Sequence, residues 1–186
     1  APCSSYVLEY LREYFDITVF FSNPNITDRE EYSKRLETLY KLIDSAPFCK
    51  NVKVVEDKIG ADMFFNAVRG FEKEPEGGKR CDICIKLRME RTAEYAMNYG
   101  YSLFGTTLTV SPHKNHILIN GISKELSEKY GIRYLPSDFK KKNGYKRSIE
   151  LSAEYDLYRQ DYCGCAFSKV EREKSTRMGK ISSLPA

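Results

Sequence analysis

The stretch Ile17-Thr18-Val19-Phe20-Phe21-Ser22-Asn23-Pro24-Asn25 decides the fold class. Its β-branched and aromatic run predicts a short buried strand, and the Asn-Pro-Asn sequence that follows predicts a turn. Thr27-Asp28-Arg29-Glu30 then has a capping-box pattern, and the apolar spacing beyond it predicts a helix that ends near Ser45. Strand, turn and helix in this order are the repeating unit of an α/β protein.

The same unit recurs in both directions along the chain. We expect further helices at about 7–15 (capped by Ser4 or Ser5), 64–71, 81–98 and 116–130, and strands at 52–55, 101–110 and 132–135. This alternation predicts a mostly parallel sheet with helices on both faces, because parallel neighbours need crossover connections. The active site of such a sheet lies outside the carboxyl ends of its strands, so the turns at 23–25, 111–114 and Cys3 should share one rim.

The two ends of the chain carry separate expectations. Ala1-Pro2-Cys3-Ser4-Ser5 already has the composition of a turn entering a helix, whereas an α/β protein places a strand before its first helix. We therefore expect a first strand upstream of Ala1. Residues 1–186 otherwise predict a single α/β domain with a loosely ordered tail from about 173 to 186.

Composition limits the class of protein. The chain has 186 residues, of which 41% are hydrophobic, enough for one packed domain and too many for a disordered chain. No apolar run approaches the ~20 residues of a membrane span, and no signal peptide is recognisable, which favours a soluble cytoplasmic protein. Six cysteines crowded into short motifs indicate metal or redox chemistry in a reducing compartment rather than a disulfide scaffold.

Positive charge concentrates in the last third of the chain. The net charge is +4, and residues 131–186 carry 12 basic and 7 acidic side chains. Five of these cations stand close together, at Lys140, Lys141, Lys142, Lys146 and Arg147. Phe139 and Tyr145 lie beside them, so the segment can contact phosphates and stack on unpaired bases of a nucleic acid. The alternative is a solvated loop in front of a helix.

Cys81-Asp82-Ile83-Cys84 is a C-x-x-C motif at the predicted start of a helix. Its sulfurs would lie one turn apart, where the free backbone N–H groups favour thiolate. A zinc ligand pair, half of an iron–sulfur site and a dithiol couple all use this spacing, and two buried thiols are the bland alternative.

Cys163-Gly164-Cys165 is a rarer C-x-C motif. A disulfide across it closes a very small ring, which favours a reversible redox pair over a structural bridge, and Gly164 permits the backbone that such a ring needs. Alternatively, both sulfurs ligate a metal beside Cys81 and Cys84. Cys3 stands at a turn, where it either faces a metal or is simply buried.

Candidates for proton transfer lie near these motifs. Asp161 and Tyr162 immediately precede the C-x-C, and His113 stands in the turn after a predicted strand, next to Lys114. Each can protonate a departing oxygen. The alternative is that Asp161 and Tyr162 belong to a hydrogen-bonded loop that holds the dithiol.

Taken together, these motifs resemble the epoxyqueuosine reductases of the QueH type. The resemblance runs from residue 1 to about residue 168 and rests on five motifs in order: Ala1-Pro2-Cys3, Asn23-Pro24-Asn25 with Tyr32, Glu76 to Cys84, Thr106-Thr107-Leu108 with Ser111 to Asn115, and Tyr158 to Cys165.

The resemblance implies a Rossmann-like, nucleotide-hydrolase-like fold and the removal of the epoxide oxygen from epoxyqueuosine at the wobble position of tRNA. It also implies a [4Fe-4S] cluster held by Cys81, Cys84 and an adjacent Cys-Cys pair upstream of residue 1. Cys163 and Cys165 match the redox-active pair of the family. A second metal ion beside the cluster is implied as well, with Cys3 as a ligand.

Opening an epoxide to an alkene needs two electrons and protonation of the departing oxygen. On this hypothesis the cluster or a neighbouring metal polarises the oxygen, Cys163 and Cys165 supply or relay electrons, and Asp161, Tyr162 or His113 donates the proton. The basic segment would contact the anticodon loop of tRNA, and the electron donor is unidentified.

Two other classes stay open from the residues alone. In the first, Cys81, Cys84, Cys163 and Cys165 form a structural zinc tetrathiolate in a non-catalytic RNA-binding protein. The second is an ATP-dependent tRNA-modifying enzyme on the same fold. The chain has no S-G-G-x-D-S-like phosphate loop, which argues against this class, although such a loop would lie upstream of Ala1.

Overall fold

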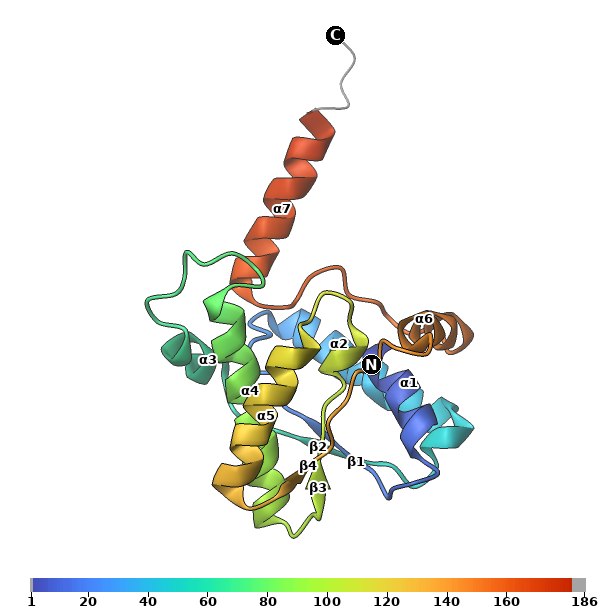
Figure 1. The fold of residues 1–186 in the computed structure, drawn as a ribbon. Helices are drawn as coiled ribbons and strands as arrows, with labels where there is room; N and C mark the ends of the chain where they lie inside the picture. Colours follow the sequence, from blue (N-terminus) through green and yellow to red (C-terminus); the bar gives the residue numbers. More distant parts are fainter. Residues whose placement is uncertain (1, 182–186) are drawn as a thin grey trace.

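A computed structural model describes the backbone of residues 2–181 and the side chains of residues 2–175. Helices and strands alternate along the chain (Figure 1). Their order is α1 (Pro2–Leu11), β1 (Thr18–Phe21), α2 (Arg29–Ser45), β2 (Lys53–Glu56), α3 (Ala61–Ala67), α4 (Lys79–Asn98), β3 (Leu103–Phe104), α5 (His116–Tyr130), β4 (Arg133–Tyr134), α6 (Gly144–Glu154) and α7 (Ala166–Ile181). Short 3₁₀ turns span Pro47–Cys49 and Leu108–Val110. The predicted Rossmann-like α/β class is confirmed.

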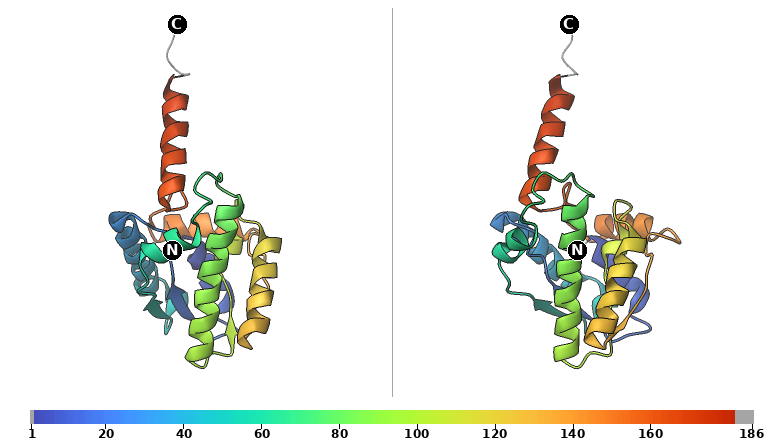
Figure 2. Two further views of the ribbon diagram at one scale, coloured as in Figure 1. Left: turned by 90° about the vertical axis from the view of Figure 1, so that its left-hand side faces the viewer. Right: turned by 60° about the vertical axis from the view of Figure 1, so that its left-hand side comes forward.

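The strands pair in parallel, as the alternation predicts. Within the described residues they form two separate pairs, β1 with β2 and β3 with β4. Thr18 lies opposite Lys53 in the first pair, and Leu103 lies opposite Arg133 in the second. Both pairs run through the centre of the molecule between the helices (Figures 1 and 2). The strand expected upstream of Ala1 stays a prediction.

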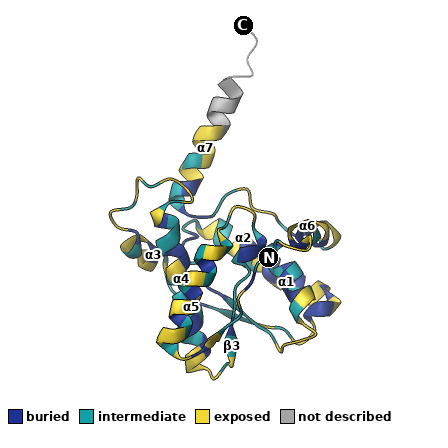
Figure 3. Cartoon of the chain, viewed as in Figure 1, coloured by how far each residue is buried: buried dark blue, intermediate teal, exposed yellow. Residues whose placement is uncertain are grey.

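Three groups of buried side chains hold these elements together (Figure 3). The first joins α4 and α5 to β3 and β4, and the second joins α1, α2 and α6 and includes Cys49. The third is small and consists of Phe64, Val68, Cys84 and Cys165, with Phe167 packed against it. This third cluster brings α3, α4 and the first turn of α7 together around two cysteines.

Most predicted element boundaries agree with the structure. Helix α2 ends at Ser45 and α5 at Tyr130, and Gly131 follows α5 in the left-handed conformation. Asp28 caps α2, since its side chain accepts hydrogen bonds from the backbone N–H groups of Glu30 and Glu31. None of the described helices has the length and apolar character needed to cross a membrane.

Three predictions of local structure differ from what the structure shows. The strand expected over 101–110 is wrong beyond Phe104, because the Thr106 hydroxyl accepts the N–H of Leu108 at 3.1 Å and starts a 3₁₀ turn. Ser4 and Ser5 are not caps, because α1 already begins at Pro2. Residues 173–181 of the expected tail are helical, and 182–186 lie outside the described residues.

Candidate active site

Four cysteines from two motifs line one small cavity. Cys81 and Cys84 come from the first turns of α4, and Cys163 and Cys165 come from the segment that enters α7. The cavity measures about 20 Å³, room for roughly one water molecule. Its other lining residues are Asn25, Phe64, Arg80, Ile85, Arg88, Leu108 and Lys114.

The C-x-x-C pair is positioned by the helix that carries it. Cys81 and Cys84 are three residues apart on α4, and the backbone N–H of Gly77 donates a hydrogen bond to Cys81 Sγ at 3.2 Å. Cys84 is buried, and this burial raises the pKa of its thiol to about 12, while the nearby Arg88 guanidinium opposes the shift. Without a bound metal, Cys84 is therefore a neutral thiol.

The C-x-C pair lies on an irregular segment with one special backbone position. Gly164 has a φ of +112°, and a Cβ added there would lie 3.0 Å from Ile26 Cγ1 and 3.1 Å from Arg35 Nη1. The backbone N–H of Ser168 donates to Cys165 Sγ at 3.4 Å. Both thiols are free in the structure. The positive φ and the close neighbours explain the glycine at this position, and its role in a disulfide ring stays a prediction.

The side chain of Arg35, on α2, supports the C-x-C segment, a role that the sequence did not indicate. Its guanidinium donates hydrogen bonds to the carbonyl oxygens of Cys163 at 3.0 Å and Tyr162 at 3.1 Å. Its Nε pairs with Glu31 Oε1 at 2.6 Å, and the two side chains are only 10% and 11% exposed. The spacing of Glu31 and Arg35 indicates a helical ion pair, but nothing local points to a loop 128 residues away.

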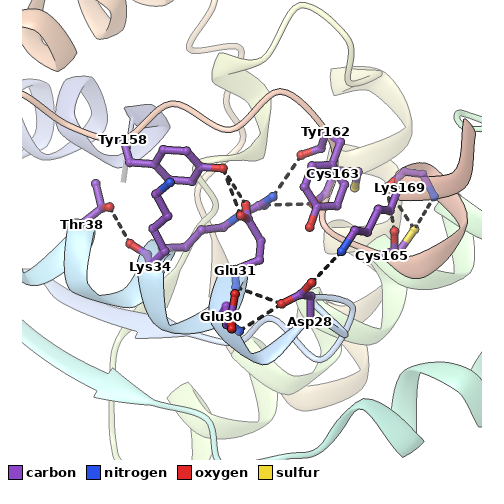
Figure 4. A network of polar contacts seen from close by, with 12 residues as sticks. Asp28, Glu30, Glu31, Lys34, Thr38, Tyr158, Tyr162, Cys163, Cys165 and Lys169 are labelled. Atoms are coloured by element: carbon purple, nitrogen blue, oxygen red, sulfur yellow. Dashed lines mark hydrogen bonds and ion pairs between the residues drawn. The ribbon is translucent and has the colours of Figure 1, made fainter. Parts of the chain in front are cut away.

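Tyr158 completes the support of the C-x-C segment (Figure 4). Its hydroxyl donates to both carboxylate oxygens of Glu31, at 3.0 and 3.2 Å, and Lys34 Nζ lies 3.8 Å from the centre of its ring. Burial and the Glu31 carboxylate raise the pKa of Tyr158 to about 12, so the phenol stays a donor at neutral pH. Glu31 is therefore shared between the α2 helix and the segment that leads to Cys163.

Three cations line the cavity, and its described lining contains no carboxylate. Arg88 donates to the backbone oxygen of Ser22 at 3.1 Å and to Asn23 Oδ1 at 2.7 Å, which ties α4 to the turn after β1. Lys114 Nζ lies 4.0 Å from Cys163 Sγ. Burial raises the pKa of the Cys163 thiol, and the Lys114 ammonium opposes that shift. The third cation is Arg80, whose guanidinium donates to the backbone oxygens of Glu72 and Glu74 and to the Glu171 carboxylate. The nearby cations Arg88 and Lys114 lessen, but do not cancel, the effect of burial on the thiols.

Asn25 adds a polar atom without a partner to this lining. It is 1% exposed, and its Oδ1 accepts no hydrogen bond from the described residues. Burying an amide oxygen without a hydrogen bond costs free energy. Asn25 Oδ1 is therefore an acceptor that a water molecule or a bound ligand can use. Asn25 and Lys114 line the same cavity, so two of the three turns expected on one rim, those at 23–25 and 111–114, lie together, whereas Cys3 is not part of the lining.

The other predicted residues lie outside the lining. Cys3 belongs to the first turn of α1, where burial raises the pKa of its thiol. Asp161 is 64% exposed and faces Arg172 at 3.4 Å, and His113 is exposed as well. The carbonyl of Tyr162 contacts Arg35, but its side chain is not part of the lining. Of the charged residues named in the sequence analysis, Lys114 lies in the cavity lining, with its Nζ 4.0 Å from Cys163 Sγ.

The basic segment divides into two parts. Lys141, Lys142 and Lys146 are exposed. Arg147 instead pairs with Glu9 of α1 at 2.6 Å, and this carboxylate raises the pKa of the guanidinium. Lys140 Nζ lies 3.3 Å from the Lys114 backbone oxygen, 3.3 Å from His116 Nδ1 and 3.8 Å from Asp138.

The residues present suit a metal that prefers sulfur. Four thiols face one cavity, and Cys81 with Cys84 has the helical spacing of a ligand pair. Within the described residues no three His, Cys, Asp or Glu side chains are already grouped as ligands. The C-x-x-C thus fits two ligands of a cluster, whereas a four-sulfur zinc site would require the pairs to move together.

Comparison with known proteins agrees with the motifs. The model of the family described as epoxyqueuosine reductase QueH matches residues 1–171. A relative of that name from Streptococcus pyogenes is 44% identical over 170 residues, which cover 90% of this chain and 67% of the relative. One from Thermotoga maritima is 38% identical over 173 residues, 92% of this chain and 89% of the relative. The chain therefore belongs to the epoxyqueuosine reductase QueH family of oxidoreductases.

Proposed function

We propose that this chain reduces epoxyqueuosine in tRNA to queuosine, with the cysteine-lined cavity at the centre of its active site. The observation that carries the proposal is that a C-x-x-C on α4 and a C-x-C before α7 face one cation-lined cavity. Membership of the QueH family supports the substrate and the reaction class.

The reaction balances with the residues at hand. Both C–O bonds of the epoxide break, a C=C bond forms, and the oxygen leaves as water, which consumes two electrons and two protons. Oxidation of Cys163 and Cys165 to a disulfide releases two electrons and two protons. An external dithiol reductant then regenerates the pair. The Lys114 ammonium, 4.0 Å from Cys163 Sγ, favours the thiolate that begins this oxidation.

Cys81 and Cys84 are the proposed cluster ligands within this chain. The resemblance places two further ligands in a Cys-Cys pair before Ala1, and Cys3 is proposed for a second metal. When bound, a [4Fe-4S] cluster supplies one-electron transfer and an iron that acts as a Lewis acid. The residues of the chain would hold the substrate beside it, with Arg88 and Lys114 as the lining cations proposed to face the electron-rich oxygen.

Proton delivery and RNA binding complete the proposal. Asp161, Tyr162 and His113 are the donors proposed from the sequence, and each must move to reach the cavity, whereas Lys114 already lines it. Because the cavity holds about one water molecule, the modified base must enter with movement of these side chains. Lys140, Lys141, Lys142 and Lys146 are proposed to contact the phosphates of the anticodon arm.

Metal analysis tests this function first. The chain and a version extended upstream by the strand with its Cys-Cys pair are purified without oxygen, and iron, acid-labile sulfide and zinc are measured per chain. We expect about four irons with matching sulfide in the extended protein and little in the 186-residue chain. The extended protein should then convert epoxyqueuosine-containing tRNA to queuosine-containing tRNA with a chemical reductant.

A non-catalytic zinc protein is the alternative, favoured by the four thiols on one cavity. About one zinc per chain in both forms, without iron and without turnover, would establish this alternative and overturn the reductase proposal.

A further inference from the structure

Three aromatic rings stand in a row on α1 and the turn that follows it. Tyr6, Tyr10 and Tyr14 recur at a spacing of four residues, and we call them, together with Phe139, the tyrosine stripe. Tyr6 stacks on Tyr10 with ring centres 5.9 Å apart, and Tyr14 follows Tyr10 at 6.2 Å. Tyr10 is 43% exposed and Tyr14 66% exposed. Rings held this far out in solvent are not accounted for by core packing.

Phe139 connects the stripe to the basic segment. Its ring meets Tyr6 and Tyr10 edge-on, at 6.5 and 6.2 Å. Phe139 immediately precedes Lys140, whose Nζ donates to the Lys114 backbone oxygen at 3.3 Å. Lys114 lines the cavity and lies 4.0 Å from Cys163 Sγ. A continuous chain of contacts thus leads from the proposed redox sulfur to exposed aromatic rings.

The charge around the stripe fits a polyanion. Lys141, Lys142 and Lys146 are exposed beside it. The Glu9 carboxylate on α1 is already engaged, because it pairs with Arg147 at 2.6 Å. Just after α1, Glu13 lies 4.0 Å from Arg12. Lys141 stays 75% exposed although its Nζ lies 3.6 Å from Asp138. Exposed cations next to exposed rings are the arrangement by which proteins bind single-stranded nucleic acid, with phosphates on the cations and bases on the rings.

We propose that the tyrosine stripe stacks unpaired bases of the RNA substrate while the modified base occupies the cavity. This inference rests on the proposed function and extends it, because it assigns a second contact surface to the RNA loop. Tyr10 and Tyr14 provide the exposed faces. Phe139 and Tyr6 contact Tyr10, which in turn contacts Tyr14. The lysines set affinity through phosphates, and the rings select unpaired over paired RNA.

The experiment compares two RNA probes on the full chain. One is a hairpin with the sequence of a tRNA anticodon arm, and the other is a blunt RNA duplex with the same number of phosphates. Binding is measured over a range of salt concentrations for Tyr10→Ala, Tyr14→Ala and their Phe counterparts. Tyr40→Ala and Tyr99→Ala serve as controls, because these tyrosines are 43% and 69% exposed on α2 and just after α4.

We expect each Ala variant of the stripe to bind the hairpin between about fivefold and 100-fold more weakly, with an unchanged salt dependence. The duplex affinity, the Phe variants and the two control variants should match the unaltered chain. Lys142→Gln and Lys146→Gln should weaken both probes and lower the salt slope by roughly 0.7 each.

The possible failures are distinguishable. If the unaltered chain prefers the hairpin and the stripe variants bind it as Tyr40→Ala and Tyr99→Ala do, the stripe proposal is overturned and the reductase proposal stands. If the unaltered chain shows no preference for the hairpin over the duplex, the stripe proposal is overturned too. If it binds neither RNA, the proposed RNA substrate is wrong and both proposals fall.

Discussion

The two cysteine pairs reach the same cavity by different means. Cys81 and Cys84 are placed by the backbone hydrogen bonds of α4, so their spacing follows from local helical geometry. Cys163 and Cys165 lie on an irregular segment whose carbonyls are held by Arg35, 128 residues earlier in the chain. The first pair is suited to a static ligand role, and the second to a pair whose sulfurs change their bonding.

The largest effect should come from removing sulfurs one at a time. In the extended, iron-loaded protein, Cys84→Ser should lose its iron, because a cluster ligand is gone. Cys163→Ser should keep its iron, while repeated turnover falls by roughly a thousandfold or more. Iron content and turnover are measured on the same samples. Equal iron loss in both variants, or normal turnover by Cys163→Ser, would remove the distinction between the pairs.

Loss of the Arg35 support should destabilise the fold and change the reactivity of the C-x-C pair. Arg35→Met leaves Glu31 buried without its partner, which should lower the free energy of unfolding by about 3–5 kcal/mol. Arg35→Lys keeps a charge beside Glu31 but cannot bridge two carbonyls, so an intermediate loss is expected. Urea unfolding gives these energies, and the alkylation rate of Cys163 and the midpoint potential of the dithiol report on the loop.

Lys41→Met is the matched control for Arg35. Its partner Asp156 is 97% exposed, so the loss should stay below about 1 kcal/mol. The positioning role of Arg35 would be refuted by an unchanged dithiol potential and an unchanged alkylation rate in both Arg35 variants.

A smaller effect should follow from adding a single methyl group at Gly164, between the two cysteines of the C-x-C. Gly164→Ala meets both a φ of +112° and close contacts with Ile26 and Arg35, so it should destabilise the fold by about 1–3 kcal/mol. Gly121→Ala on the exposed face of α5 has open space and ordinary backbone, and should stabilise by about 0.5–1 kcal/mol. Thermal unfolding measures the stability change of each variant. Changes of the same sign in the two variants would contradict this explanation.

The smallest effect concerns an exposed ion pair between Asp28, at the start of α2, and Lys169 of α7. Asp28 caps α2 with Oδ1 and pairs through Oδ2 with Lys169 at 2.7 Å, and this pairing lowers the pKa of the Asp28 carboxyl (Figure 4). Because this pKa is lowered in the folded state, the carboxylate stabilises the fold at pH values above its ordinary pKa of about 3.9. That stabilisation is lost as the pH falls through the lowered pKa. Asp28→Asn keeps a capping oxygen but not the charge.

The melting temperature of Asp28→Asn should therefore lie slightly below that of the unaltered chain from pH 8 to 5. The difference should shrink as pH falls below about 4. A difference that persists at strongly acidic pH would show that the effect does not come from the carboxylate.

Much of the fold was predictable because its signals are local. The capping pattern before Arg29 and the glycine after Tyr130 mark helix ends within the same few residues that form them. The strand expected over 101–110 failed because the Thr106 hydroxyl competes with strand pairing, a choice that apolar content does not reveal.

The site was predictable only in part, for a related reason. Two short cysteine motifs sufficed to nominate the four sulfurs that line the cavity. Arg35 was not nominated, and the turn at 23–25 was placed on the rim without any sign that Asn25 Oδ1 would be left unpaired. Both features depend on what the folded chain brings next to these residues. Asp161 and Tyr162 lie beside Cys163 in sequence but not in the cavity lining.

Helix α7 leaves the rest of the molecule as a straight rod (Figure 2). At sixteen residues it is about 24 Å long. Among the described side chains, its anchors to the rest of the molecule lie in its first two turns, where Lys169 pairs with Asp28, Glu171 with Arg80 and Arg172 with Asp161. Mechanically this is a lever clamped at one end, with the clamp beside a cysteine of the cavity. A sideways load on the far end is therefore delivered as torque to the surroundings of Cys165, where a flexible linker of the same length would absorb it.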